Sequence, residues 1–335
     1  MRMERIQTSM DELDRIECAV SACICTVLLI TYNHKPYFRQ AIESVLAQKT
    51  KYSFKIHVFD DASTDGTSEL VREYAERYPD KVKAFIAEEN QGAQTNFWSA
   101  YQSVDTKYCA LLECDDYWCG EEKLELQIDA LEQNPECSFC AHNTRIVNVG
   151  DTCRRFEDNT LLVTSQEMQG GGIYSLKSFE MLYSGYINHL DSRVIRMCCI
   201  DFSELKNKET LLYDNAQFFY LISKGFLFYI DRVMGVYNQT GTGTFSGEKL
   251  ICRMRTHINN LLQANKDINY AAEKVIYEHL NSFLGYNLWL DDIAQNKREP
   301  PKEVSPGWRR WAGIVKFICP PFIIRFLKWV RDCFK

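Results

Sequence analysis

The chain has 335 residues, which is enough for one large hydrophobic core or for a core with a smaller appendage. Hydrophobic residues make up 46% of it and charged residues 25%, a balance typical of globular proteins and not of disordered ones. The formal net charge is −6, and an acidic protein binds nucleic acid poorly, so we expect no nucleic-acid partner.

Buried strands alternate with helices between residues 24 and 134. Continuous apolar or β-branched runs predict strands at residues 24–31, 54–59, 82–87 and 108–112. Helices are expected from Pro36, after Thr67, through Phe97 and over residues 121–134. This alternation predicts an α/β fold with a mainly parallel central sheet flanked by helices.

Acidic side chains follow two of these strands. Residues 60–67 (DDASTDGT) come directly after the second strand, and Glu113, Asp115 and Asp116 follow the fourth. Each segment alone could be a polar turn in which Asp and Ser act as helix caps. Parallel strands end at the same edge of a sheet, where ligands bind, so we expect the two segments to lie together. Mg²⁺ or Mn²⁺ would relieve the repulsion between the carboxylates and could bridge them to a phosphate.

The chain lacks the phosphate-binding turns of several nucleotide enzymes. Neither acidic segment contains a P-loop or a Gly-x-Gly-x-x-Gly turn, which disfavours a mononucleotide kinase or a dinucleotide enzyme. A nucleotidyltransferase that makes activated sugars would need a glycine-rich basic turn after the first strand. Residues 31–36 contain no such turn.

The pattern is weaker beyond residue 135. We expect a loop at 161–172, a helix at 213–224, a strand at 226–230 and a glycine-rich loop at 240–247. Residues 250–296 have the pattern of helices throughout, and residues 297–306, with three prolines, should form a linker.

The last 29 residues, 307–335, are basic and aromatic. They carry seven Lys or Arg and one Asp, or +6, which leaves −12 on residues 1–306. No stretch approaches the ~20 apolar residues that span a bilayer, and Pro320-Pro321 would interrupt a helix. Two short amphipathic helices on an anionic membrane surface fit this pattern, and packing against protein is the alternative.

Fourteen cysteines raise the question of disulfides. Residues 1–17 are strongly charged and lack the apolar segment of a secretory signal, so we expect reduced thiols in a cytoplasmic protein. Cys137 and Cys140 with His142 could begin a metal site, but a second ligand pair at zinc-like spacing is missing.

Four motifs resemble those of the nucleotide-sugar glycosyltransferases of family 2, which have the GT-A fold. They are VLLITYN (27–33), DDASTDGT (60–67), the Asn-x-Gly of 90–92 and LLECDDYW (111–118), with a weaker match over 213–247. Members are inverting enzymes that use a nucleoside-diphosphate sugar and a divalent metal. The resemblance therefore implies such a donor and Mn²⁺ or Mg²⁺.

The resemblance also implies roles for individual residues. Asp61 should face the base, Asp115 should lie by the ribose and the metal, and Asp116 should bind the metal directly. Glu113 replaces an Asp of many relatives, which favours a supporting charge over a direct role. The residues expected to bind the nucleotide sugar are Thr31, Tyr32, Asn33, Asp61, Ser63, Asn90, Gly92, Glu113 and Asp115.

An inverting transfer needs a general base for the acceptor hydroxyl. By its spacing before Gly225, Asp214 is the candidate that the resemblance favours, with Asp191 as the second choice. The alternative for Asp214 is that it only caps the helix that follows it. Many relatives have Tyr-Arg-x-His where this chain has residues 237–240 (YNQT), so a contact to the diphosphate could be lost or supplied by the following loop.

The processive-synthase motif Gln-x-x-Arg-Trp is absent, which favours transfer of one sugar to a glycan or polyprenyl-linked glycan acceptor. We expect this work at the inner face of a bacterial plasma membrane, in surface glycan assembly. The alternative is a catalytically silent GT-A domain that binds nucleotide sugar or scaffolds a glycan assembly complex. The expected parts are an extension (1–23), a GT-A domain (24–247, with halves 24–135 and 136–247), a helical region (248–296), a linker (297–306) and the tail (307–335).

Overall fold

The structure is a computed structural model. It divides into two compact units, Met1–Gly285 and Tyr286–Lys335. The residues that it describes are 23–149, 160–163, 168–176, 178, 189–203, 205, 213–240, 250–269 and 276. The expected extension, linker and basic tail, most of the loop at 240–247 and most of residues 270–296 lie outside these ranges. The domain boundaries therefore stay predictions.

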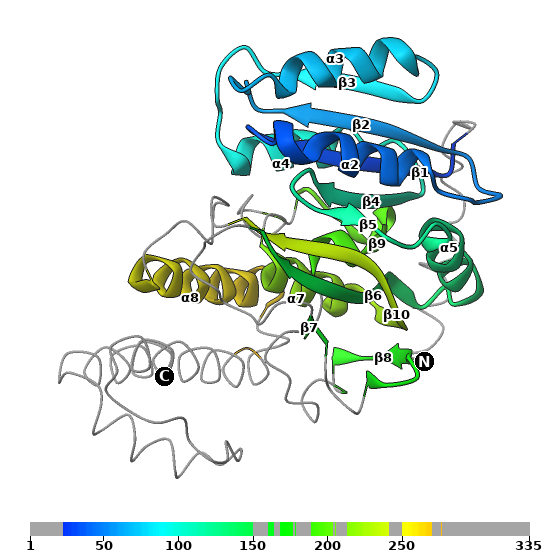
Figure 1. The fold of residues 1–335 in the computed structure, drawn as a ribbon. Helices are drawn as coiled ribbons and strands as arrows, with labels where there is room; N and C mark the ends of the chain where they lie inside the picture. Colours follow the sequence, from blue (N-terminus) through cyan, green and yellow to red (C-terminus); the bar gives the residue numbers. More distant parts are fainter. Residues whose placement is uncertain are drawn as a thin grey trace. The chain divides into compact units, whose positions relative to one another are not determined.

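Four parallel strands form the first half of the sheet (Figure 1). Their order is β3-β2-β1-β4, and they span Cys25–Thr31 (β1), Phe54–Asp60 (β2), Val82–Ile86 (β3) and Tyr108–Glu113 (β4). In the register, Thr31 lies beside Asp60 and Ile30 beside Glu113. The carboxyl ends of β1, β2 and β4 are therefore level, as predicted, and both acidic segments emerge at one edge.

Helices on both faces of this half make it an α/β structure, as predicted from the alternation of the sequence. They span Lys35–Leu46 (α2), Thr67–Arg77 (α3), Ala93–Gln102 (α4) and Lys123–Gln133 (α5). Each face has its own core: Leu28 and Ile30 of β1 pack in one hydrophobic cluster, whereas Val27 and Leu29 pack in the other. A strand that is buried on both faces needs the continuous apolar sequence found here.

The second half of the sheet is mixed. The order continues β9-β6-β10-β5, with β7 on β6 and β8 on β10. These strands span Tyr117–Trp118 (β5), Cys137–Asn148 (β6), Thr160–Leu161 (β7), Gly172–Tyr174 (β8), Val194–Arg196 (β9) and Phe226–Gln239 (β10). The remaining elements are the short 3₁₀ turns Leu190–Ser192 (η2) and Met197–Cys199 (η3) and the helices Asp214–Lys224 (α7) and Leu250–Asp267 (α8).

Two local expectations for this half need correction, and one strand was missed. The strand expected at 226–230 extends to Gln239, and the segment 161–172, expected to be a loop, includes the end of β7 and the start of β8. Strand β6 was not predicted at all. It buries Ser138, His142 and Asn143, so its sequence lacks the apolar run or clean alternation that marks a strand.

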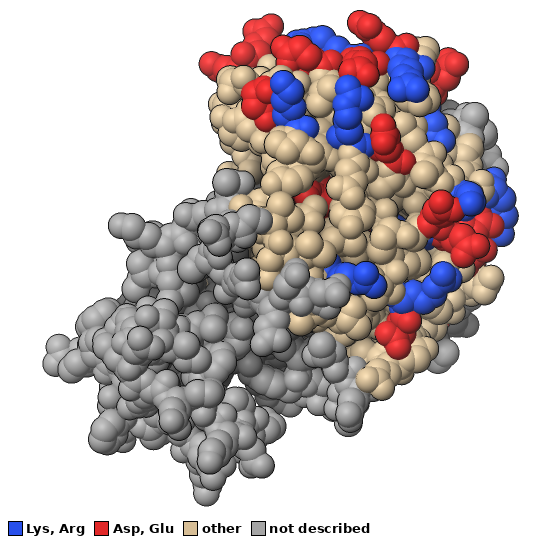
Figure 2. All heavy atoms as spheres, in the orientation of Figure 1, with Lys and Arg blue, Asp and Glu red and all other residues tan. Residues whose placement is uncertain are grey.

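The described surface around α3 carries acidic and basic side chains interspersed with one another (Figure 2). In the part of the chain that the structure describes, no helix is both long and apolar enough to cross a membrane. The nine cysteines that the structure describes are free thiols. Cys137, Cys140 and His142 all lie on β6 and do not form a cluster with the spacing of metal ligands.

Candidate functional site

Two loops at the carboxyl ends of β1 and β2 are joined by hydrogen bonds. The backbone N–H of Asn33 donates to Ser63 Oγ at 2.8 Å, and the N–H of Thr64 donates to Asn33 Oδ1 at 2.8 Å. Asn33 has a φ of 57°, in the left-handed region that Asn tolerates better than most residues. Thr31 is buried beneath these loops, whereas Tyr32 is 44% exposed. An exposed ring above a rigid loop pair is available for stacking against a ligand.

Asp61 fixes a third loop beside the first two. Its two carboxylate oxygens accept the backbone N–H groups of Gln91 and Gly92 at 2.8 and 2.9 Å. The side chain of Asn90 donates to the carbonyl of Asp61 at 3.3 Å. Gly92 has a φ of 85° at the start of α4, a conformation that favours glycine. Asp61 therefore fixes the position of this loop, and its predicted contact with a base stays a prediction.

The acidic turn after β4 is held by the end of β10. Asp116 is buried, and its Oδ1 accepts the backbone N–H of Asn238 at 2.7 Å. The side chain of Asn238 donates to the carbonyl of Asp115 at 2.6 Å. This Asn stands in the YNQT segment that departs from the pattern of many relatives. In the structure, the segment contacts the acidic turn itself.

A compact cluster joins this turn to the segment before β9. Ligand atoms of Glu113, His189 and Asp191 all lie within 4.8 Å of one another. Asp191 Oδ1 accepts the N–H of Glu113 at 3.0 Å, and His189 Nδ1 lies 3.4 Å from Asp191 Oδ2 and 3.9 Å from Asp116 Oδ2. The His189 ring also packs on the ring of Tyr237, with centroids 4.7 Å apart. Four acidic or imidazole side chains thus share one small volume.

Crowding and burial shift the pKa values of this cluster. Burial raises the pKa of Glu113 well above its usual range, and the charges of Asp191 and Asp115 raise it further. Burial also raises the pKa of Asp116 well above its usual range, and the charges of Asp115 and Asp191 raise it further. For His189, burial favours the neutral ring, but nearby carboxylates, Asp214 first, outweigh it and raise its pKa to about 9. The site is therefore arranged to hold positive charge among the carboxylates.

The cluster suits a divalent cation. Two carboxylates and an imidazole are ligands that Mn²⁺ accepts, and Mg²⁺ binds the carboxylates. His189 Nδ1 and Asp191 Oδ2 are both buried, and apart from their 3.4 Å contact with each other neither has a hydrogen-bond partner among the described residues, as expected of atoms that would bind an ion. Glu113, expected to be only a supporting charge, lies in this group. Asp116 lies beside it and keeps one oxygen toward His189, whereas Asp115 lies 4.0 Å from His34 Nδ1.

Asp214, the predicted base, borders the cluster from α7. It is the first residue of the helix and not its N-cap, which is Tyr213, so the capping alternative is wrong. Its Oδ1 accepts the N–H of Leu190 at 2.5 Å. The buried guanidinium of Arg193 donates to the carbonyl of Asp214 at 2.8 Å and to Gln217 Oε1 at 2.7 Å. Asp191, the second candidate for the base, belongs to the cluster with Glu113 and His189 instead.

Sequence reasoning identified the acids but missed His189. The short pattern His189-x-Asp191 was a possible signal, because two ligand-type residues two positions apart can face one ion. Nothing in the sequence alone placed this pair beside Glu113, because 75 residues separate them from it. The antiparallel pairing of β9 with β4 decides their position: Val194 at the start of β9 pairs with Ala110, and the residues before β9 continue toward Glu113 at the carboxyl end of β4.

Comparison with known proteins agrees with this geometry. Residues 26–202, more than half of the chain, match the family described as glycosyl transferase family 2. The chain belongs to this family.

Curated relatives match over shorter stretches. The uncharacterized protein Rv1520 of Mycobacterium tuberculosis is 35% identical over 122 residues, which cover 36% of this chain and 35% of that protein. The putative teichuronic acid biosynthesis glycosyltransferase TuaG of Bacillus subtilis is 30% identical over 116 residues, 35% of this chain and 44% of TuaG. The match thus spans less than half the length of these two relatives.

Solved structures share the fold at low sequence identity. Residues 1–349 of TarS from S. aureus superpose with a TM-score of 0.51 at 18% identity, over 78% of this chain and 72% of that chain. The mannosyltransferase PcManGT of Pyrobaculum calidifontis, solved with GDP-Man and Mn²⁺, has a TM-score of 0.52 at 15% identity, over 83% and 76% of the two chains. These likenesses establish the GT-A fold of this chain.

Proposed function

We propose that this protein transfers one sugar from a nucleoside-diphosphate sugar to a hydroxyl of a glycan or lipid-linked glycan, with inversion and with a divalent metal. The observation that carries the proposal is the cluster of Glu113, His189 and Asp191, with Asp116 beside it. This cluster lies at the edge of the sheet from which the loops after β1 and β2 also emerge. Family membership supports glycosyl transfer, and TarS and PcManGT, which share the fold, were solved with UDP-GlcNAc and GDP-Man.

The loops after β1 and β2 are the proposed nucleotide side of the site. Tyr32 offers an exposed ring, and Asn33, Ser63 and Asp61 hold the loops in a fixed shape. The acidic cluster is the proposed diphosphate side. Glu113, His189, Asp191 and Asp116 would hold Mn²⁺ or Mg²⁺, which supplies positive charge that stabilises the departing diphosphate.

Asp214 is the proposed base. Its carboxylate would take the proton of the acceptor hydroxyl while that oxygen bonds to the anomeric carbon and the bond to the diphosphate breaks with its electron pair. The Leu190 N–H and Arg193 hold Asp214 next to the cluster. Asp191 is less suited to this step, because its carboxylate accepts the N–H of Glu113 and faces the cluster.

The proposed acceptor and location rest on the name of one relative and on the sequence of the last 29 residues. TuaG is named for teichuronic acid biosynthesis, which is in keeping with a surface-glycan acceptor for this chain. The basic aromatic sequence 307–335 would attach the enzyme to the anionic inner face of the plasma membrane, where a polyprenyl-linked acceptor is available. A silent GT-A domain is the second candidate, and the YNQT departure is the observation that favours it.

The test is hydrolysis of, or transfer from, a panel of nucleotide sugars with Mn²⁺, using the full chain and three variants. We expect activity to be lost in Asp116→Ala together with Mn²⁺ affinity. In Asp214→Asn, transfer should fall by about 10²-fold or more with nucleotide binding retained. Glu76→Ala on the exposed face of α3 is the control and should match the wild type. Full activity of Asp116→Ala would refute the metal assignment, and no activity in the wild type with any donor would favour the silent domain.

A further inference from the structure

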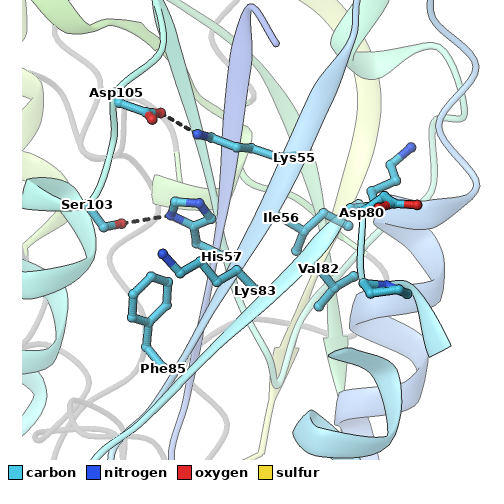
Figure 3. A pocket seen from close by; sticks show the side chains of 11 residues that line it. Lys55, Ile56, His57, Asp80, Val82, Lys83, Phe85, Ser103 and Asp105 are labelled. Atoms are coloured by element: carbon cyan, nitrogen blue, oxygen red, sulfur yellow. Dashed lines mark hydrogen bonds and ion pairs between the residues drawn. The ribbon is translucent and has the colours of Figure 1, made fainter. Parts of the chain in front are cut away.

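A hollow lies away from the acidic cluster, at the other end of the sheet. It has a volume of about 430 Å³, within the range of small-molecule sites. The early residues of β2 and β3 line it together with the segment after α4, whereas the acidic cluster follows the carboxyl ends of the strands. We call it the His57 pocket (Figure 3). The lining residues that matter for its chemistry are Lys55, His57, Lys83, Phe85, Ser103 and Asp105.

His57 presents a free nitrogen in this pocket. Ser103 Oγ donates its single hydrogen to the carbonyl of Ala100 at 2.7 Å, so it accepts the Nδ1–H of His57 at 2.9 Å. His57 Nε2 then carries a lone pair and has no hydrogen-bond partner among the described residues. The side chain is only 5% exposed. His57 lines the pocket, so this unused nitrogen is open to a ligand that enters there.

Two lysines act on the His57 ring, and among the described residues one of them has no carboxylate beside it. Lys83 is the cross-strand neighbour of His57, and its ammonium lies 4.8 Å from the centroid of the Phe85 ring, toward which it extends in Figure 3. In the described part of the chain, Lys83 pairs with no carboxylate, whereas Lys55 pairs with Asp105. Burial, then Lys55 and Lys83, lower the pKa of His57 to about 4, against the opposing charge of Asp105. The ring is therefore neutral at pH 7 and can gain a proton if an anion enters.

The pocket is also larger than one phosphate group and has an aromatic wall. The Phe85 ring stacks on Phe59 with centroids 4.3 Å apart and lies 5.3 Å from His57. At the far side, Lys81 lies over the Phe54 ring at 3.7 Å and Asp80 is its acidic neighbour in sequence. The lining thus combines three lysines with two acids. One of these lysines, Lys55, forms an ion pair with Asp105. Such a lining suits an anion that carries a small organic group.

We propose that the His57 pocket binds a small phosphomonoester, with its phosphate between the Lys83 ammonium and His57 Nε2 and its organic part against Phe85. On binding, His57 takes up one proton from solvent at Nε2 and becomes a donor to the phosphate. The groups that face the ring are Lys55 from its own strand, Lys83 and Phe85 from β3, and Ser103 and Asp105 from the segment after α4. The site does not depend on the proposed transfer activity.

The test is calorimetric titration of the full chain with glycerol 3-phosphate in EDTA at pH 7. Without a divalent cation the acidic cluster repels phosphate, so binding at the proposed donor site does not contribute. We expect saturable binding that Lys83→Glu weakens about tenfold or more, because the charge beside the phosphate is reversed. Lys266→Glu, an exposed lysine on α8, is the matched control and should bind as the wild type does.

A second readout is specific for the contact with His57. In ¹⁵N-detected NMR of its imidazole, the ring should titrate at higher pH with the ligand present than without it. Tighter binding of dihexanoyl phosphatidic acid than of glycerol 3-phosphate would identify a lipid headgroup as the source, and equal binding would identify a soluble metabolite. The proposal is refuted if no saturation occurs below about 10 mM, or if Lys83→Glu and Lys266→Glu bind equally well. Failure of Asp116→Ala to lose activity would leave this result unchanged.

Discussion

Lys123 is fully buried at the start of α5, and its charge should cost stability in a pH-dependent way. Its side chain has 0% exposure, and its ammonium nitrogen has no hydrogen-bond partner. Burial lowers its pKa from 10.5 to about 7, against smaller opposing effects of buried thiols such as Cys25. The nearest compensation is the ring of Trp118, whose centroid lies 3.9 Å from the nitrogen.

The magnitude follows from the pKa change. A shift of about 3.5 units corresponds to about 5 kcal/mol. Between pH 7 and 10.5 the unfolded chain holds a proton that the folded chain has lost. The free energy of unfolding therefore rises with pH across this window by up to about 1.4 kcal/mol per unit. Below pH 7 the penalty is complete, and above 10.5 it vanishes.

We therefore expect Lys123→Met to be more stable than the wild type by about 4 kcal/mol at pH 7, because methionine fills a similar volume without a charge. The gain should shrink steadily as the pH approaches 10.5. Urea unfolding, followed by tryptophan fluorescence at several pH values, measures the gain at pH 7 and its decrease with pH. Lys266→Met, which changes an exposed lysine, is the control and should leave the pH profile unchanged. A variant less stable than the wild type at every pH would show that the ammonium is a net stabilising group.

Two further predictions follow from the pKa shifts. Affinity for Mn²⁺ should rise between pH 6 and pH 9, because the ion must displace protons from Glu113, Asp116 and His189, whose pKa values are raised. Calorimetry at fixed ionic strength would measure this affinity at each pH. An affinity that does not change with pH would place the ion elsewhere. Cys198 and Cys119 are both exposed residues, but Cys198 should react with iodoacetamide at pH 7 well before Cys119. A hydrogen bond from Cys199 and the charge of Arg196 outweigh burial and lower the pKa of Cys198 to about 6, whereas burial of the Cys119 sulfur raises the pKa of Cys119. Equal labelling of the two cysteines in peptide mapping would contradict this prediction.

The sequence by itself determined the first half of the molecule and one side of the candidate site. The short apolar runs around Val27–Ile30 and Tyr108–Leu112 are typical of strands that are buried on both faces. Parallel strands of similar length end level, so the loop at 60–67 and the acids from Glu113 to Asp116 had to meet at one edge. These inferences need only local patterns and the geometry of a parallel sheet.

Only the tertiary structure decided which side chains complete that edge. His189 and Asp191 reach Glu113 because the three-residue strand β9 runs antiparallel to β4, a pairing too short to leave a pattern in the sequence. Asp214 reaches the same place through the N–H of Leu190. The burial of Lys123 and the free nitrogen of His57 are likewise set by what packs around them. Local sequence specifies strands and turns, whereas contacts between distant segments fix burial, and burial sets the charge of these groups.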